Sequence, residues 1–189
     1  MSKQTTDALM LDLKRNTRAI VLANNLRIMP NARFSAGIQN TRYVDVNYNA
    51  VQGKYEILFQ TADFNPPNNQ TVQYLPWASA SGIYIFLQKQ PPIFFTDKLT
   101  GCFLAFDMEK QKISHLNFMD YSDEDKRKTL QAYSHCHVLC PEDYLGNTNV
   151  LGVLKEQWEF FFQVEGLRAG TLSMSDKINR YGTKSVVLT

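Results

Sequence analysis

The sequence is poor in the features that mark several protein classes. Its three cysteines are an odd number in a 189-residue chain, and a chain of that length buries a full-sized core without disulfide staples. It contains no run of the about 20 apolar residues that a membrane-spanning helix needs. Neither charge dominates, because 20 Lys+Arg stand against 18 Asp+Glu and leave a net charge of +2. We therefore expect neither nucleic acid nor a membrane as a partner.

A secretory signal is also missing from the beginning of the sequence. Asp7 and Asp12 lie among the basic residues there, and the longest apolar run, Ala19–Ala23, is shorter than the apolar region of a signal peptide. With at least one thiol left outside any disulfide, this predicts a protein made in a reducing cytosol without Sec export.

The composition is that of an ordinary globular domain, at 44% apolar, 12% aromatic and 20% charged residues. Without an internal repeat or linker, residues 1–189 are predicted to form a single domain. Hydroxyl caps followed by acids predict helices over 6–17 and 122–133. Apolar alternation predicts strands near 43–48, 55–59, 72–77, 82–87, 93–96, 102–108, 112–118, 158–164 and 184–188. The predicted fold class is α+β, a mostly antiparallel or mixed β-sandwich flanked by a few α-helices.

The most informative segment contains Cys102 and His115. If its two strands pair as a hairpin around the loop Asp107–Lys110, these two residues lie directly opposite each other. Their Cβ atoms would then be about 4.5–5.5 Å apart on one face of the sheet. A loop of another length would alter this register.

Such a pair would suit nucleophilic catalysis. An adjacent imidazolium lowers the pKa of a thiol and populates the nucleophilic thiolate, and the histidine can then protonate a leaving group and deprotonate water. Gly101 permits a tight turn that leaves the backbone N–H of Cys102 pointing at a developing oxyanion. The alternative is that Cys102 is a small buried hydrophobe and His115 a hydrogen-bonded structural residue.

Four short motifs around this pair resemble a known family. They are a Leu-Pro-Trp run at 75–77, a Phe-Phe-Thr run at 94–96, a Leu-Thr-Gly-Cys turn at 99–102 and the downstream His115. In order and spacing they resemble the glutamine deamidase toxins typified by Burkholderia lethal factor. More distant relatives in that family are the catalytic domain of cytotoxic necrotizing factor and the chemoreceptor glutamine deamidases. The resemblance covers residues 72–118, and outside them only the order of elements matches.

The resemblance implies a role for each matching residue. Cys102 would be the nucleophile, His115 the general acid and base, and Thr96 the group that orients the histidine through its side chain or its carbonyl. The turn that would help to hold the oxyanion consists of Leu99, Thr100, Gly101 and Cys102. The sequence departs from the family at Thr100, where serine is common, and at Asp97–Lys98, where bulkier aromatic residues border the substrate entrance. The second departure leaves the choice of target open.

The implied activity converts a glutamine side chain of a host protein to glutamate with release of ammonia, and it needs neither a metal nor an organic cofactor. The resemblance further implies a monomeric bacterial toxin or effector, a virulence protein made in the bacterial cytoplasm. It would act in the host cytosol on the translation-initiation RNA helicase and so inhibit protein synthesis. Three alternatives stay open: a Rho-family GTPase as target, transglutamination or proteolysis through the same thioester, and a non-enzymatic binding protein with an inert Cys102.

A second group of candidate residues is His135, Cys136, His137 and Cys140. In a strand the two histidines face one side and the two cysteines the other, so the four cannot converge on one tetrahedral zinc ion. A helix would bring the cysteines together, but Pro141 and the β-leaning residues before it disfavour one. We therefore expect no metal here, and a buried strand with its thiols inward. One of the histidines could still approach the catalytic face.

Overall fold

The structure is a computed structural model that describes residues 15, 26–29, 41–49, 54–59, 70–76, 82–144, 146–164 and 168–189. Its first three strands are β1 (Leu26–Met29), β2 (Thr41–Asn49) and β3 (Lys54–Phe59). The later strands are β4 (Gln70–Leu75), β5 (Ile83–Phe86), β6 (Ile93–Thr96), β7 (Phe103–Asp107), β8 (Lys112–Leu116), β9 (His137–Leu139), β10 (Thr148–Leu154), β11 (Trp158–Val164), β12 (Arg168–Ile178) and β13 (Lys184–Leu188). The described helices are α2 (Asp123–Leu130) and the 3₁₀ helix η1 (Gln131–Tyr133).

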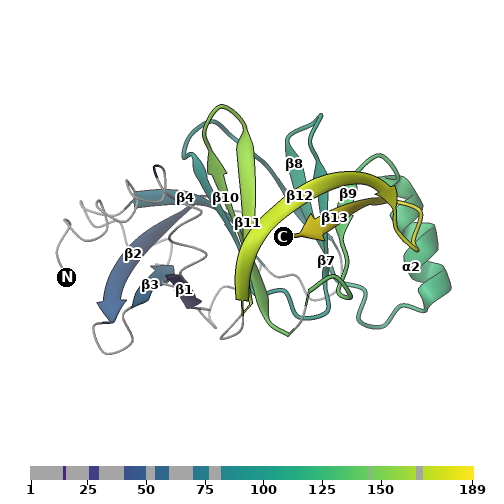
Figure 1. The fold of residues 1–189 in the computed structure, drawn as a ribbon, viewed down its shortest axis with the longest axis horizontal. Coiled ribbons are helices and arrows are strands. Elements are labelled where there is room, and N and C mark those ends of the chain that lie inside the picture. The colour runs from purple at the N-terminus through teal and green to yellow at the C-terminus, as the bar shows by residue number, and fades with distance from the viewer. Residues whose placement is uncertain are drawn as a thin grey trace.

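Within the described residues, all 13 strands belong to one mixed sheet with the order β1-β3-β2-β4-β6-β10-β11-β12-β13-β9-β7-β8-β5. The pairs β1–β3, β4–β6 and β9–β13 are parallel, and the other neighbours are antiparallel. The ten strands that begin with β4 and end with β5 in this order curl into a nearly closed barrel. The edge strand β5 comes back into contact with β4. Figure 1 shows β1–β3 at one end of the molecule and α2 at the other.

One buried side chain bridges the seam between β4 and the chain that follows β5. The amide nitrogen of Gln73 donates to the carbonyls of Gln88 and Pro91 at 2.8 and 2.6 Å. Its amide oxygen accepts from the backbone N–H of Gln88 at 2.8 Å. A primary amide can satisfy backbone groups of both kinds, so Gln73 replaces the strand-to-strand bonds that are missing at this edge.

The fold prediction is confirmed in part. The protein is mostly β with a mixed sheet, as predicted, but this is one continuous curled sheet with a single short α-helix in its described part. The helix predicted over 122–133 is observed as α2 and η1, and Ser122 caps it by accepting from the N–H of Asp125 at 3.1 Å. The helix predicted over 6–17 lies outside the described residues except at Arg15, which is helical. No helix in the described part is long and apolar enough to cross a membrane.

The two faces of β7 build two separate cores. Its alternate residues point to opposite faces, so Leu104 and Phe106 enter an inner core to which all ten strands from β4 to β13 contribute. Phe103 and Ala105 enter an outer core that includes Leu130 of α2. Aromatic and branched side chains dominate both cores, and their burial is the main force that holds α2 and the barrel together.

The cysteines divide between these cores. All three are buried thiols outside any disulfide, whereas the odd count alone predicted at least one. Cys102 belongs to the inner core, whereas Cys136 and Cys140 belong to the outer one. This division places Cys102 on one side of β7 and Cys136 and Cys140 on the other.

Candidate functional site

The hairpin that carries Cys102 and His115 differs in register from the prediction. β7 and β8 pair antiparallel with Leu104 opposite His115, so Cys102 lies two residues before the position that faces the histidine. The loop starts one residue later than predicted because Asp107 remains in the strand. There its Oδ1 caps the turn by accepting from the backbone N–H of Lys110 at 3.1 Å. The prediction that Cys102 lies directly opposite His115 is therefore wrong.

A shift of two residues nevertheless keeps both side chains on one face of the sheet, because the side-chain period of a strand is two. Cys102 lies in the inner core with Leu104, and Leu104 is the residue that His115 faces. Cross-strand neighbours on such a diagonal are typically about 7–8 Å apart, still within the reach of long side chains. Cys102 and His115 are thus neighbours on the inner face without a hydrogen bond between them.

The ring of His115 is held from one side. Its Nδ1 lies 3.0 Å from the carbonyl oxygen of Pro76, the residue after β4. A carbonyl can only accept, so Nδ1 carries the hydrogen and the neutral ring keeps a lone pair on Nε2. That Nε2 is buried and has no hydrogen-bond partner among the described residues. An unsatisfied buried nitrogen is costly, and an oriented imidazole with an open basic nitrogen is what general-base chemistry needs.

Burial also sets the charge of this ring. His115 is 1% exposed, and its burial lowers the pKa below the ordinary value of 6.5. The Pro76 carbonyl and the negative charge of Asp97 oppose that shift without cancelling it. The ring is therefore neutral at neutral pH, the form that can accept a proton.

The turn before Cys102 is fixed to the first residue of β10 and to the residue before it. Leu99 and Thr148 exchange two backbone hydrogen bonds, of 2.7 and 3.1 Å. The hydroxyl of Thr100 donates to the side chain of Asn147 at 3.0 Å. Gly101 adopts φ +74°, a left-handed conformation that costs glycine little. These contacts direct the chain from the exposed turn into the inner core.

Cys102 itself is 1% exposed. Its thiol contacts the carbonyl of Thr100, with the sulfur 3.8 Å from the oxygen, and its own carbonyl accepts from the hydroxyl of Tyr144 at 2.7 Å. Burial raises the pKa of Tyr144 above its usual range, so this phenol stays protonated and remains a donor. The backbone on both sides of the thiol is therefore anchored.

Thr96 has a different set of partners from the one the resemblance implies. Its hydroxyl accepts from the backbone N–H of Val150 at 2.9 Å, and its carbonyl accepts from the amide of Asn149 at 3.4 Å. Both partners lie in β10, so Thr96 joins β6 to β10. The group that orients His115 is the carbonyl of Pro76. The Leu-Pro-Trp run was the one sequence signal that pointed to this position.

The second candidate group is rearranged as well. Cys136 and Cys140 lie in the outer core, and burial raises the pKa of their thiols to about 11 and about 12. The prediction is confirmed in part: both thiols are buried, but the strand β9 covers only His137–Leu139, so the two cysteines flank it and lie in the outer core. His135, however, contacts both Cys136 and Asp107, with its Nε2 3.5 Å from the sulfur and 3.1 Å from Oδ2. Asp107 was missed because only the pairing of β7 with β9 brings it there.

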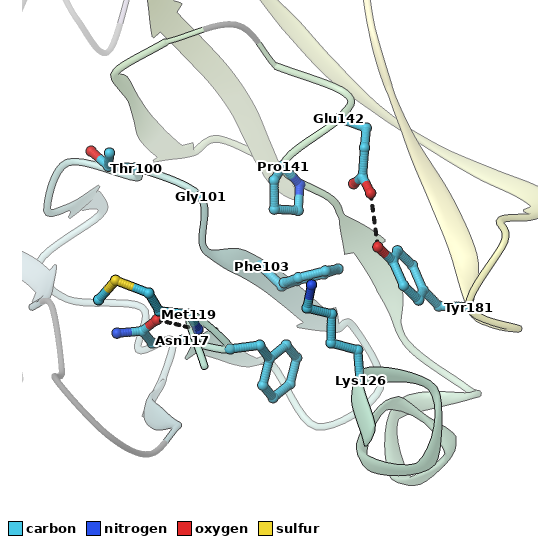
Figure 2. A pocket seen from close by; sticks show the side chains of 10 residues that line it. Thr100, Gly101, Phe103, Asn117, Met119, Lys126, Pro141, Glu142 and Tyr181 are labelled. Atoms are coloured by element: carbon cyan, nitrogen blue, oxygen red, sulfur yellow. Dashed lines mark hydrogen bonds between the residues drawn. The ribbon is translucent and has the colours of Figure 1, made fainter. Parts of the chain in front are cut away.

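A pocket with a volume of about 420 Å³ opens beside the turn that precedes Cys102. Figure 2 shows the turn residues Thr100 and Gly101 at one side of it and Lys126 of α2 at another. Asn117 and Tyr181 also line it, so its wall combines apolar surface with polar groups. The pocket lies on the Phe103 side of β7, on the face opposite the Cys102 thiol.

Comparison with protein-family models finds no match to this chain, and comparison with curated proteins finds none either.

Proposed function

We propose that the protein is a cysteine-dependent protein glutamine deamidase with Cys102 as nucleophile and His115 as general base and acid. The observation that carries the proposal is the state of His115, whose Nδ1 is bonded to the Pro76 carbonyl. Its buried Nε2 lacks a partner among the described residues and lies on the same inner face as Cys102. The resemblance of the surrounding motifs to the deamidase toxins supplies the reaction class.

The proposed reaction uses this arrangement in two steps. Nε2 takes the thiol proton of Cys102 while the sulfur bonds to the carboxamide carbon of the substrate glutamine. The oxyanion is stabilised by the backbone N–H of Cys102, and Nε2 passes its proton to the departing nitrogen, which leaves as ammonia. Water then gives a proton to Nε2 and attacks the thioester carbon. The carbon–sulfur bond breaks, and the products are glutamate and the restored thiol.

This mechanism requires two local rearrangements. The thiol must turn from the Thr100 carbonyl toward Nε2 through a change of its χ1 rotamer. A substrate side chain must also enter, because Cys102 and His115 are each 1% exposed. The turn at Thr100 and Gly101 is exposed and directly precedes the nucleophile, so we place the entrance there.

The proposed substrate is a host protein, the translation-initiation RNA helicase, with a Rho-family GTPase as the alternative target. The support for this choice is the motif resemblance. The composition adds that recognition would be of the protein itself, since a net charge of +2 gives little attraction for RNA. Conversion of a glutamine to glutamate in that helicase would inhibit protein synthesis.

The direct test incubates purified protein with each candidate target and follows Gln→Glu conversion by peptide mass spectrometry and ammonia release. Cys102→Ser is the test variant. Cys140→Ser is the matched control, because it removes an equally buried thiol from the outer core. Conversion by the wild type and the control, but not by Cys102→Ser, supports the proposal. Amine incorporation or backbone cleavage would replace it with transglutamination or proteolysis.

A second measurement does not depend on the target. Brief treatment of the native protein with iodoacetamide, followed by peptide mapping, should label Cys102. It should leave Cys136 and Cys140 unmodified, since burial raises the pKa of these thiols to about 11 and about 12. An unreactive Cys102, together with no conversion of either target, would favour a non-enzymatic binding protein.

A further inference from the structure

Three donor atoms converge on the outer face of β7, away from the proposed catalytic pair. They are Oδ2 of Asp107, Nε2 of His135 and Sγ of Cys136, and all lie within 4.8 Å of one another. Asp107 ends β7, whereas His135 and Cys136 lie between η1 and β9. The two segments are brought together by the β7–β9 pairing, in which Phe106 faces His137.

The geometry differs from that of a proton relay. In a Cys–His–Asp relay the thiol and the carboxylate use opposite nitrogens of the imidazole. Here both approach the same nitrogen, since Nε2 lies 3.1 Å from the carboxylate oxygen and 3.5 Å from the sulfur. One N–H cannot point at both acceptors with good alignment. A shared centre that all three atoms face accounts for the arrangement better.

Two of the three separations between the donor atoms are close to those of a tetrahedral metal site. Zinc binds nitrogen and oxygen at about 2.0–2.2 Å and sulfur at about 2.3 Å, so neighbouring ligand atoms in a tetrahedron lie about 3.3–3.7 Å apart. The observed 3.1 and 3.5 Å are close to these values. An ion would bind both the Asp107 oxygen and the Cys136 sulfur, which lie within 4.8 Å of each other, through adjustment of these side chains.

The chemistry of the donors narrows the choice of ion. Thiolate, imidazole and carboxylate are the three side-chain ligands that zinc uses, and three protein ligands leave a fourth position for water or another donor. We propose that Asp107, His135 and Cys136 form a zinc site with an open fourth position. This site goes beyond the proposed deamidase activity, which uses no metal.

The surroundings hold the ligands in place and leave a path from solvent. Oδ1 of Asp107 accepts from the backbone N–H of Lys110, so the carboxylate presents its other oxygen to the site. The backbone N–H of Cys136 donates to the carbonyl of Tyr133 at 2.8 Å, which fixes the turn. Asp107 and Cys136 are buried, but the side chain of His135 is 48% exposed. Outer hydrogen bonds of this kind orient metal ligands.

The positive charge of a neighbouring lysine disfavours binding of a cation at this site. The ammonium nitrogen of Lys110 lies 3.5 Å from Oδ2 of Asp107, with a side chain that is 64% exposed. An exposed lysine can swing into solvent at little cost, since surface ion pairs are weak. Zinc would therefore displace Lys110 from the carboxylate, and Lys110→Ala should bind zinc at least as tightly as the wild type.

The test is a titration of the purified, chelator-treated full chain with Zn²⁺ and, separately, with Co²⁺. We expect one equivalent of zinc per chain, and a cobalt form with a thiolate-to-cobalt charge-transfer band that reports the sulfur ligand. Cys136→Ser should lose that band and bind zinc at least about tenfold more weakly, because even outer-sphere partners contribute that much. Cys140→Ser and His137→Gln, which alter the same segment outside the site, should behave as the wild type.

A second measurement covers the case in which Cys136→Ser fails to fold. In the native wild type, saturating Zn²⁺ should protect Cys136 from slow alkylation and leave Cys102 labelling unchanged. Absence of stoichiometric zinc in the wild type would overturn the proposal. So would a charge-transfer band that survives in Cys136→Ser, or one that disappears in Cys140→Ser.

Discussion

The two faces of β7 carry two cysteine–histidine groupings that differ in almost every physical respect. On the inner face Cys102 and His115 are both 1% exposed and share no hydrogen bond; Cys102 directly precedes β7, and His115 lies in the neighbouring strand β8. On the outer face Cys136 and His135 are adjacent in sequence, in contact with each other and with Asp107, and open to solvent through the histidine. On the inner face of β7 the histidine keeps a basic nitrogen that is unbonded in the described part of the chain. On its outer face the nitrogen, sulfur and oxygen atoms lie close together.

The difference shows that residue types alone do not define chemistry. His115 is fixed through Nδ1 and keeps Nε2 open, which suits a residue that must accept and deliver protons. His135 directs a single nitrogen at two acceptors, which suits coordination of an ion. The charge of the Asp107 carboxylate also suits coordination of an ion. Burial would raise the pKa of Asp107, but hydrogen bonds from Lys110 and His135 hold it below its ordinary value, so it stays an anionic ligand.

After loss of the nucleophile itself, the largest effect should come from removing the proposed base. His115→Gln keeps a polar side chain that can donate to the Pro76 carbonyl but cannot accept a proton, so we expect the rate of deamidation to fall by about 10²–10⁴-fold. His137→Gln is the control: it lies opposite Phe106 on the same inner face, is half-buried in β9, and should change the rate less than about twofold because it has no part in the proposed mechanism. Steady-state ammonia release measures both. Equal losses in the two variants would contradict the assignment of His115 as the base.

Substitutions of Thr96 test whether this residue or the Pro76 carbonyl orients His115. Thr96→Val removes the hydroxyl that accepts from the N–H of Val150 and leaves that buried donor unsatisfied, which should destabilise the fold by about 1–3 kcal/mol. Thr96→Ser should recover most of the loss. Because the Pro76 carbonyl orients His115, we expect kcat at a temperature well below unfolding to be unchanged in Thr96→Val. A large fall in kcat without loss of stability would return Thr96 to the role of orienting residue.

Much of the fold was predictable because it depends on local patterns. Alternating apolar residues located most strands, and the Ser122 cap located α2. The site was less predictable because three of its features depend on non-local backbone. The turn cap by Asp107 set the hairpin register, a carbonyl of Pro76 oriented the histidine, and the pairing of β7 with β9 brought Asp107 to His135. The position of a backbone carbonyl and the identity of a strand partner cannot be predicted from composition or from the spacing of residues.

Two glycines with positive φ allow the effect of backbone strain on stability to be distinguished from an effect on the reaction rate. Gly101 and Gly182 have φ of +74° and +84°, and a Cβ would meet no atom within 4 Å at either position. Each glycine-to-alanine change should therefore cost about 1–2 kcal/mol through left-handed strain alone. Gly101→Ala should also lower kcat, because it shifts the turn that presents Cys102, whereas Gly182→Ala should not. Urea unfolding and ammonia release distinguish the two, and equal kcat values in them would argue against a role for this turn.

The smallest effect concerns pH. The lowered pKa of His115 means that the unfolded chain takes up a proton near pH 6.5 while the folded chain does not. His115 therefore contributes stability that is fully present above pH 6.5 and is lost as the pH falls from 6.5 toward the lowered pKa. The slope is at most about 1.4 kcal/mol per pH unit. Urea unfolding from pH 7 down to pH 5 should show this slope reduced in His115→Gln, and an unchanged slope would contradict a buried neutral ring.

The most direct test of which face is catalytic is peptide mass spectrometry of the translation-initiation RNA helicase. The helicase is incubated with the wild type, with Cys102→Ser or with Cys136→Ser before the measurement. We predict one or more Gln→Glu conversions with the wild type and with any Cys136→Ser protein that folds. Cys102→Ser should reduce conversion by about six orders of magnitude, as removal of the nucleophile does in a serine protease. Conversion that persists in Cys102→Ser, or that depends on Cys136 instead, would contradict the assignment of the inner face as the catalytic one.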